Sequence, residues 1–313
     1  MPAIATLTLN PTIDAAYAVD RVRHTDKIRA NAEHYDPGGG GINVARVVAR
    51  LGGAARCYYL SGGATGRALD ALLDLHQLAC SRITIQGETR ICTNVFEIES
   101  GKEYRFVPAG PTVEANEWQA CLEQIGQASC TYLVASGSLP PGVPADFYAR
   151  VARIAECNGF RFVLDSSGAG LQGGLAAAEK GSGVFLVKPS LAELRQISGE
   201  PLDCEEEIGA AALALVSSGR AETVAVTLGA EGALLARRQG IVRLPALSIE
   251  ARSAVGAGDS FLGAMVFKLS NGCNPVEAFR YGIAAGAAAV LNPGTGLSQA
   301  ADIKRFYRLV AKS

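Results

Sequence analysis

Short, almost wholly apolar segments alternate with longer amphipathic segments along most of the 313-residue chain. This alternation constrains the fold strongly, because strands that are apolar throughout need burial on both faces, as in a parallel sheet covered by helices. We therefore predict an α/β fold with a doubly wound, mainly parallel sheet flanked by helices. The predicted buried strands are Ile4–Leu9, Arg56–Leu60, Thr131–Ala135, Phe160–Leu164, Val184–Val187 and Thr223–Leu228. The predicted helices are Ile42–Leu51, Ala64–His76, Ala115–Ile125, Pro144–Cys157, Leu191–Ile197, Glu205–Val216, Gly258–Leu269, Pro275–Leu291 and Ala300–Val310.

Two segments, from about residue 12 to 35 and from 85 to 107, do not follow this rhythm. Their strand patterns alternate polar and apolar residues, and Glu99–Lys102 is predicted to be the turn of a β-hairpin. We expect them to meet in a small antiparallel sheet, which cannot bury both faces alone and so suggests a flap or an oligomer contact. Because no Pro- or Ser-rich linker and no repeat divides the chain, we predict a single domain over residues 1–313 that carries this discontinuous β lid.

Composition and charge exclude several classes of protein. Hydrophobic residues make up 49% of the chain and charged residues 19%, which excludes a disordered protein. The 29 Lys and Arg against 30 Asp and Glu leave no excess of positive charge for binding a nucleic acid. The longest apolar stretches, such as Ile283–Leu291, are too short to span a bilayer. Since the N-terminus also lacks the basic region of a secretory signal, we expect a cytoplasmic protein with no membrane partner.

The cysteines point to packing rather than to metal binding. The eight cysteines form no C-x-x-C pair, and the chain has only three histidines, so a structural zinc site is excluded. We predict that the cysteines fill the core of a protein in a reducing cytosol.

A run of four glycines, Gly38–Gly41, precedes a predicted helix that begins at Ile42 and Asn43. Glycine leaves the backbone accessible, and the free N–H groups of a helix start attract oxygen-rich ligands. A dinucleotide fingerprint is disfavoured, because it requires glycine where Asn43 stands and an acidic residue about 20 positions later. A purely structural turn is the other alternative. We favour a ligand-binding junction, since a simple turn rarely needs four glycines followed at once by Ile-Asn.

A second glycine-containing segment, Ser253–Leu262, leads into another predicted helix. The main-chain N–H groups of Gly256, Ala257 and Gly258 converge at the helix start, where the helix dipole favours negative charge. Asp259 lies in the first turn of that helix. Its carboxylate could accept a proton while the N–H groups stabilise charge on a transferring phosphoryl group. An N-terminal cap is the commonest role of Asp at this place, and the spacing alone leaves both roles open.

The motifs of two common phosphoryl-transfer scaffolds are absent from the sequence, namely G-x-x-x-x-G-K-[ST] of the P-loop and H-R-D with D-F-G of protein kinases. Five other segments resemble, in order and spacing, the ribokinase-like carbohydrate kinases of the PfkB type. These segments are Thr6–Asp14, Gly38–Arg46, Ser136–Gly142, Val187–Leu194 and Val255–Ser260. The resemblance extends over essentially the whole chain. It implies a ribokinase-like fold and an enzyme that uses ATP and Mg²⁺.

Within this family, the resemblance implies transfer of the γ-phosphoryl group of ATP to the O1 hydroxyl of D-fructose 6-phosphate, which gives fructose 1,6-bisphosphate. Relatives that phosphorylate tagatose 6-phosphate or fructose 1-phosphate typically carry Lys at the position of Gly40, and these acceptors stay as alternatives. A catalytically silent sugar-phosphate sensor on the same fold is a further alternative. An NAD-linked oxidoreductase is the last one.

The resemblance also implies roles for individual residues on the sugar side of the site. Asp259 is expected to be the general base, and the amides of Gly256, Ala257 and Gly258 are expected to hold the developing charge. The expected sugar-phosphate contacts are Asp14, Lys27, Gly39, Gly40, Gly41, Asn43, Arg90, Arg105 and Ser138. Among them, Arg90, Arg105 and Lys27 would bind the phosphate group, with Lys27 in the family often reaching a neighbouring subunit. If the resemblance is set aside, the alternative interpretation is that these three residues are exposed charges that prevent the lid strands from pairing with other strands at their edges.

On the nucleotide side, the resemblance implies contacts from Lys188, Ser190, Thr227, Gly229 and Gly232. The family pattern N-x-x-E is replaced here by Ser190-Leu-Ala-Glu193, so Glu193 is expected to hold Mg²⁺ through water, while S-x-x-E also predicts a capping box. A potassium site is implied at main-chain oxygens near Ser253, Val255, Ala289, Asn292 and Gly294. A homodimer through the β lid is expected as well.

Overall fold

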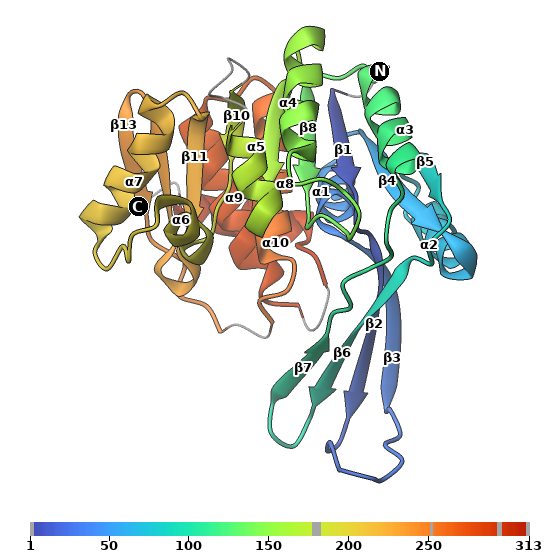
Figure 1. Ribbon diagram of the computed structural model, residues 1–313. Helices are drawn as coiled ribbons and strands as arrows, with labels where there is room; N and C mark the ends of the chain where they lie inside the picture. The colour runs from blue at the N-terminus through green and yellow to red at the C-terminus, as the bar shows by residue number, and fades with distance from the viewer. Residues whose placement is uncertain (1–2, 177–182, 251–252, 293–295, 311–313) are drawn as a thin grey trace.

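A nine-stranded sheet forms the centre of the fold (Figure 1). The computed structural model describes residues 3–176, 183–250, 253–292 and 296–310. In order across the sheet, the strands are β13 (Gly240–Leu244), β12 (Ala233–Arg237), β11 (Ala221–Thr227), β10 (Val184–Val187), β9 (Arg161–Asp165), β8 (Tyr132–Ser136), β1 (Ile4–Thr8), β4 (Ala55–Gly62) and β5 (Ala79–Ile85). Neighbouring strands from β11 to β5 run parallel, and β12 and β13 are added antiparallel at one edge.

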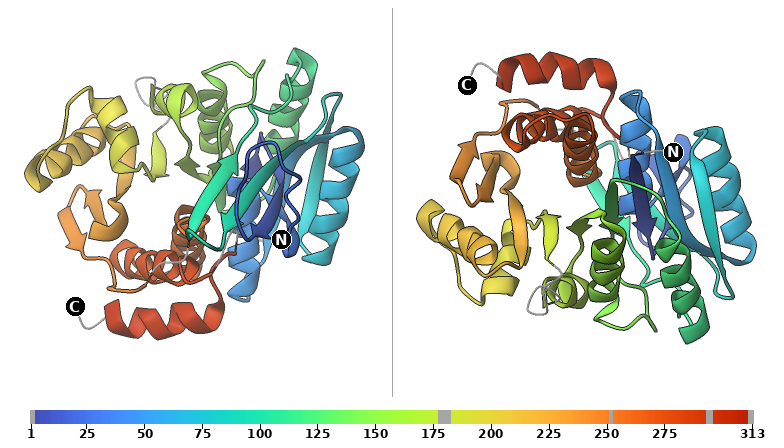
Figure 2. Two further views of the ribbon diagram at one scale, coloured as in Figure 1. Left: turned by 90° about the horizontal axis from the view of Figure 1, so that it is seen from below. Right: turned by 90° about the horizontal axis from the view of Figure 1, so that it is seen from above.

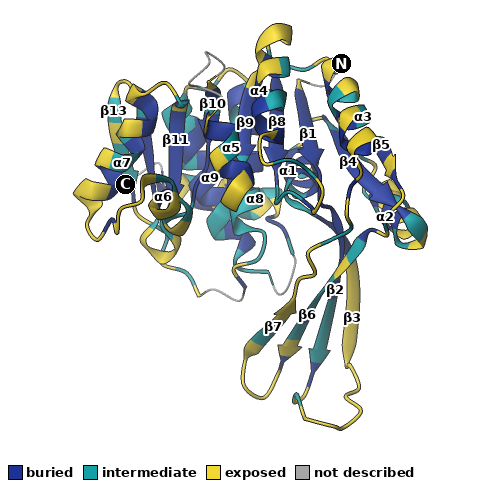
Figure 3. Ribbon diagram, in the orientation of Figure 1, coloured by how far each residue is buried: buried dark blue, intermediate teal, exposed yellow. Residues whose placement is uncertain are grey.

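Helices cover both faces of this sheet (Figure 2). One face carries α1 (Gly40–Arg50), α2 (Gly63–Leu75), α8 (Ala257–Ser270), α9 (Pro275–Ala289) and α10 (Ala300–Val310). The other carries α3 (Ala115–Gly126), α4 (Phe147–Asn158), α5 (Gly168–Ala176), α6 (Leu191–Ser198) and α7 (Glu205–Ser217). The sheet strands are therefore largely buried, as their apolar sequences require (Figure 3).

The order of the strands fixes where a ligand site can form. From β1 the chain continues to β4 and β5 on one side, whereas β8 to β11 are added on the other side. The connections after β1 and β8 therefore diverge, which leaves a crevice at the carboxyl ends of these two strands, where doubly wound sheets bind ligands. The glycine run begins at the last residue of β3 and leads into α1. It lies at this crevice, against the ends of β1 and β8.

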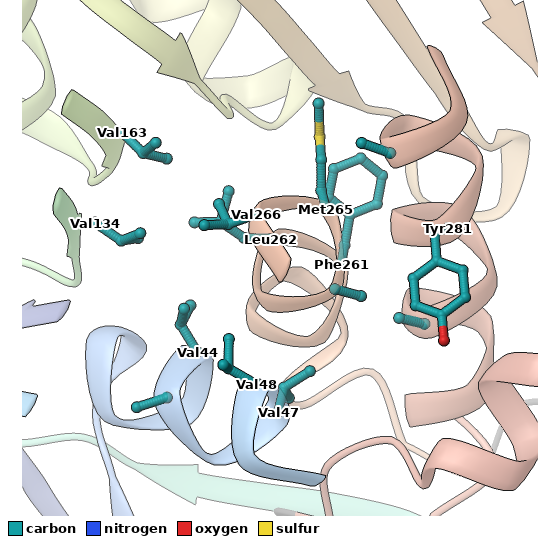
Figure 4. Close-up of a cluster of buried hydrophobic side chains, with 14 of the residues drawn as sticks. Val44, Val47, Val48, Val134, Val163, Phe261, Leu262, Met265, Val266 and Tyr281 are labelled. Atoms are coloured by element: carbon teal, nitrogen blue, oxygen red, sulfur yellow. The ribbon is translucent and has the colours of Figure 1, made fainter. Parts of the chain in front are cut away.

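Close packing of α1 on α8 brings the two glycine-rich segments together. Val44, Val47 and Val48 of α1 face Leu262 and Val266 of α8 (Figure 4). Gly263 lies at the contact, because a Cβ atom there would be 3.0 Å from the Cβ of Val47 and 3.1 Å from the carbonyl oxygen of Val44. The absence of a side chain lets the helices approach, so that their first turns lie side by side.

A four-stranded sheet extends as a lid beyond the carboxyl ends of β1 and β5 (Figure 1). It consists of β3 (Ala32–Gly38), β2 (Thr12–Val19), β6 (Arg90–Glu97) and β7 (Lys102–Phe106), in that order. The pairs β2–β3 and β6–β7 are antiparallel, and the predicted hairpin turn lies between the paired residues Glu97 and Lys102. The expected antiparallel arrangement does not hold for the central pair, because β2 and β6, through which the two segments meet, run parallel. This direction follows from the main sheet, since β2 and β6 continue from the parallel strands β1 and β5.

The predicted α/β class and each of the predicted strands and helices are confirmed, with ends that shift by a few residues. Helix α1 begins at Gly40, so two of the four glycines are helical. The prediction missed α5, β5 and the hairpin of β12 and β13. The core role of the cysteines holds for Cys57 and Cys121, which are buried, but was wrong for Cys157 and Cys204, which are exposed helix-end residues. In the described part of the chain, no helix combines the length and hydrophobicity of a membrane span.

Candidate active site

Asp259 occupies the first turn of α8, where its carboxylate points to α1 rather than capping its own helix. The N-cap of α8 is Gly256, with φ of 72°, and no side chain caps this end. The Asp259 Oδ2 instead accepts a hydrogen bond of 2.8 Å from Asn43 Nδ2. The alternative that Asp259 is simply a helix cap is therefore wrong, because Gly256 takes that position through its left-handed backbone.

The environment of Asp259 raises the proton affinity of its carboxylate. Burial is the largest influence, the negative charge of Asp165 adds to it, and together they raise the pKa of Asp259 to about 6. The hydrogen bond from Asn43 and the charges of Lys188 and Arg46 oppose this rise. Asp259 is thus ionised near neutral pH and retains the basicity that general-base catalysis needs.

The glycine run lets α1 begin directly against the carboxyl ends of β1 and β8. A Cβ atom at Gly40 would lie 2.1 Å from Ser136 Oγ and 2.9 Å from the Ser136 carbonyl carbon. At Gly41 it would lie 2.6 Å from the carbonyl oxygen of Leu7, and Gly39 is the N-cap with φ of 113°. The four glycines are therefore explained first by this close approach, which places Asn43, in the first turn of α1, beside Asp259.

A second carboxylate, Asp14 of β2, lies directly over the glycine run. A Cβ atom at Gly38 would be 2.1 Å from Asp14 Oδ2, so glycine is required there as well. Burial raises the pKa of Asp14 to about 7, against the lowering influence of Arg46, while the charges of Asp36 and Asp259 raise it further. The structure thus brings Asp14, Asn43 and Asp259 into one electrostatically coupled group.

Lys188 completes this group from the other side of α8. Its Nζ atom pairs with Asp165 Oδ1 at 3.0 Å, and a Cβ atom at Gly258 would lie 3.3 Å from the same Nζ. Although burial alone lowers the pKa of Lys188, the adjacent Asp165 carboxylate outweighs it and raises this pKa above its usual value. Lys188 therefore remains a cation at the start of α8, where an anion is also favoured by the helix dipole.

Three charged residues near this group were not predicted as site residues. Asp165 ends β9 and accepts a bond of 3.3 Å from Ser136 Oγ, and Asp36 pairs with Arg46. Asp165 could have been predicted as a site residue from its position at the carboxyl end of a buried strand, where doubly wound sheets bind ligands. Arg46 lies in a segment that matched the family, but nothing in the sequence indicates its pairing with Asp36.

The expected phosphate-binding cations lie outside this central group. Arg90 begins β6 and donates to the carbonyl oxygens of Pro108, at 2.9 Å, and Asn10, at 2.8 Å. Arg105 on β7 and Lys27 in the connection between β2 and β3 are exposed on the lid. Ser138 follows β8, and its hydroxyl accepts a long bond of 3.4 Å from Asn10 Nδ2. The structure thus links Ser138 to Arg90 through Asn10 but leaves the two other lid cations apart.

The residues expected to contact the nucleotide gather at the ends of β10 and β11. Ser190 and Thr227 form a parallel bridge, and a short 3₁₀ helix, η2 (Gly229–Glu231), follows with Gly232 next to it. Ser190 is the N-cap of α6, and its amide and hydroxyl donate to Glu193 Oε2 at 2.8 and 2.9 Å. The capping box that S-x-x-E predicts is therefore confirmed.

The expected Mg²⁺ and potassium sites depend on different donor groups, namely the Glu193 carboxylate and main-chain oxygens. In the described ranges of the chain, no three His, Cys, Asp or Glu side chains are grouped to hold a metal ion directly. A Mg²⁺ ion that is bound mainly by phosphate oxygens and water would need only an outer acceptor, the role expected of Glu193. Ser253 N donates to the carbonyl oxygen of Val290 at 3.3 Å, which joins the two loops of the expected potassium site. Gly294 lies outside the described residues.

Comparison with known proteins places this geometry in a family. A model described as pfkB family carbohydrate kinase matches residues 7–302. The ATP-dependent 6-phosphofructokinase isozyme 2 of Mycobacterium tuberculosis (strain CDC 1551 / Oshkosh) is 45% identical over 313 residues, which cover 99% of this chain and 91% of the relative. Phosphofructokinase-2 from Escherichia coli, solved in complex with potassium, matches with a TM-score of 0.94 and 37% identity, covering 99% of this chain and 100% of that one.

Two further structures extend the comparison. The same Escherichia coli enzyme in complex with fructose-6-phosphate has a TM-score of 0.92 and 36% identity, covering 99% of this chain and 100% of the other. Arabidopsis thaliana ribokinase, at 18% identity and a TM-score of 0.76, covers 98% and 99% of the two chains and shares the fold.

The family match and the full-length phosphofructokinase relatives identify a sugar kinase, a phosphotransferase with an alcohol group as acceptor, and the carboxylate and the cation at the start of α8 agree with this class. The chain belongs to the pfkB family of carbohydrate kinases. The resemblance predicted from the sequence motifs and the ribokinase-like fold are thereby confirmed.

Proposed function

We propose that the protein is an ATP-dependent 6-phosphofructokinase, which phosphorylates the O1 hydroxyl of D-fructose 6-phosphate. The contact between Asn43 and Asp259 carries this proposal, because it holds a basic carboxylate beside the N-terminus of α8. The names of the full-length relatives support the choice of acceptor. The proposal covers residues 1–313 as one catalytic domain with the lid as an insertion.

Proton transfer accompanies attack on the nucleotide in this mechanism. The ionised Asp259 accepts the proton of the sugar hydroxyl, whose oxygen forms a bond to the γ-phosphorus of ATP while the bond to the leaving ADP oxygen breaks. Since Oδ2 is held by Asn43, we assign the proton to Oδ1. The amides of Gly256, Ala257 and Gly258, with Lys188, would stabilise the charge on the transferring group.

The sugar would lie between the glycine run and the lid. Asp14 and Asn43 would present a carboxylate and an amide to its hydroxyls, and the backbone of Gly39, Gly40 and Gly41 would lie beside them. A side chain at position 40 would clash with Ser136, so this chain has no room for the lysine that the alternative kinases typically carry there. The phosphate would be bound by Arg90 together with Arg105 and Lys27, and Ser138 would add a hydroxyl contact.

The nucleotide would lie along Lys188, Ser190, Thr227, Gly229 and Gly232. Mg²⁺, when bound with ATP, neutralises phosphate charge during transfer. Glu193 would accept hydrogen bonds from its water ligands. Potassium would be held by the main-chain oxygens near Ser253, Val255, Ala289 and Asn292, a proposal supported by the potassium complex of the Escherichia coli relative.

The lid also supports a homodimer. Large hydrophobic side chains are exposed on the lid. Because a thin sheet gains little stability unless a partner covers it, these side chains favour a contact between two lids. They are Ile28, Tyr35, Ile91, Phe96, Ile98, Phe106 and Val107. A cytoplasmic location stays a prediction, consistent with eight cysteines that are all unpaired.

An ADP-release assay with Mg²⁺ and three acceptors tests the function. We expect the highest kcat/KM with fructose 6-phosphate, and weaker turnover of tagatose 6-phosphate and fructose 1-phosphate. A preference for either of the latter two would replace the acceptor but keep the kinase. Binding of fructose 6-phosphate without ADP release from any acceptor would contradict the kinase and favour the sensor.

A further inference from the structure

Arg46 lies one turn after the start of α1, behind the amide that contacts Asp259. Its Nη1 donates to Asn43 Oδ1 at 3.3 Å and to the carbonyl oxygen of Pro37 at 3.0 Å. Its Nη2 pairs with Asp36 Oδ1. One guanidinium group therefore contacts the side chain that holds the base, the backbone before the glycine run, and a carboxylate on the lid strand β3.

These contacts determine which end of the Asn43 amide faces Asp259. An amide presents an acceptor on one side and donors on the other. Because Arg46 can only donate, it requires Asn43 Oδ1 on its side and thus directs Nδ2 to Asp259. The reversed amide would place an oxygen against the carboxylate and an NH₂ group against the guanidinium, which are two unfavourable contacts.

Burial strengthens this preference. The Arg46 side chain is 2% exposed and the Asp36 side chain 8%, so their charges act through a weakly screening interior. Other groups also face Asp36, among them His34 Nε2 of β3 at 3.1 Å, His76 Nε2 at the end of α2 at 3.8 Å, and Asp14, its register partner on β2. Arg50, on the next turn of α1, also interacts electrostatically with Asp36. The anchor of Arg46 is therefore built from the lid as well as from the main domain.

We infer that Arg46 is a positioning residue for the reaction: it fixes the Asn43 amide so that its donor faces Asp259, and it ties this arrangement to the lid strand through Asp36. The role rests on the proposed function. Arg46 itself touches neither base nor substrate in this scheme. The positive charge of Arg46 also acts on the Asp259 carboxylate, although the Asn43 amide lies between the two side chains.

Two substitutions separate geometry from charge. Arg46→Lys keeps the charge and can pair with Asp36, but one ammonium group cannot reproduce the planar fork that reaches Asn43 as well. Arg46→Gln removes the charge and leaves an amide that can still donate. The matched control is Arg82→Lys, because Arg82 Nη1 forms a half-buried ion pair of 2.6 Å with Asp70 Oδ2 that does not contact the site.

The measurements are kcat and KM for fructose 6-phosphate, and the titration of the Asp259 carboxyl carbon by NMR in the protein without substrates. For Arg46→Lys we expect kcat to fall about 10- to 100-fold, because a small misplacement of a reacting group lowers the rate by such factors. We expect a smaller change in KM. For Arg46→Gln we expect the same loss and an Asp259 titration moved to higher pH. Arg82→Lys should change neither quantity.

A kcat for Arg46→Lys equal to that of the parent would overturn the positioning role, as would an unmoved Asp259 titration in Arg46→Gln. A variant with lowered thermal stability but parental kcat and titration would show that Arg46 only holds β3 to α1. If the parent protein turned over no sugar phosphate, the proposed function would fail, yet the titration would still decide whether Arg46 acts on Asp259.

Discussion

Asn43 and Asp259 are 216 positions apart in the chain, and their side chains form a hydrogen bond of 2.8 Å between the first turns of α1 and α8. Two glycine positions make this contact possible. Gly40 admits the start of α1 beside Ser136, and Gly263 admits α8 beside α1. The fold thus places an amide donor on a carboxylate whose pKa of about 6 suits a base near neutral pH.

The activity should depend on pH through Asp259 and Asp14. Burial raises the pKa values of these two carboxyl groups to about 6 and about 7, and the base must be ionised to accept a proton. We expect kcat/KM to be constant above about pH 8 and to fall as the pH is lowered through 7 and 6, because kcat/KM reports the free enzyme. A profile that stays flat down to pH 5 would contradict these values.

Replacing Asp14 by Asn should stabilise the protein at high pH. Because burial raises the pKa of Asp14 above its unfolded value, the folded state binds the proton more tightly, and stability is lost as the pH rises from about 4 to about 7. Asp14→Asn removes this loss. We expect its melting temperature to exceed that of the parent at pH 8 and to approach the parental value near pH 4. An equal or lower melting temperature at pH 8 would argue against a destabilised carboxylate.

Substitution of Gly40 should disturb the packing of α1. In Gly40→Ala the new methyl group meets Ser136, including its backbone, so we expect a loss of about 1–3 kcal/mol, as is usual for overpacking. Urea unfolding measures this loss. Gly126→Ala is the matched control, because no atom lies within 4 Å of the added Cβ atom and its stability should be unchanged or slightly higher. Equal stability of the two variants would refute the close approach.

Truncation of Arg90 tests phosphate binding on the lid. Hydrogen bonds to charged groups contribute about 1.5–3 kcal/mol, so Arg90→Ala should raise the KM for fructose 6-phosphate about 10- to 100-fold with a smaller effect on kcat. Arg153→Ala removes an exposed arginine on α4 and should change neither constant. An unchanged KM in Arg90→Ala would assign its guanidinium only to the carbonyl oxygens of Pro108 and Asn10.

The architecture could be predicted because buried parallel strands are apolar throughout and the helices between them are amphipathic. Helix α5 was missed, since its sequence Gly168–Ala176 contains four glycines, and β5 was missed because it includes polar residues. The edge hairpin of β12 and β13 breaks the alternation of strand and helix on which the prediction relied.

The site was predictable where a local pattern carries the chemistry. The start of α8 indicated Asp259, and the glycine run indicated Asn43. The sequence does not reveal which side chains meet in the fold, so Arg46, Asp36 and Asp165 were missed as site residues, although they lie beside the predicted residues Asn43, Asp14 and Lys188, respectively. Long-range pairing of charges depends on the packing of helices and strands, which no local pattern encodes.

The most direct test of the central claim is the turnover number of Asp259→Asn with ATP, Mg²⁺ and fructose 6-phosphate. The substitution preserves the shape of the side chain but removes its basicity. We predict that kcat falls by about 10²–10⁴-fold while calorimetry still detects binding of fructose 6-phosphate. A kcat equal to that of the parent would contradict the assignment of Asp259 as the base.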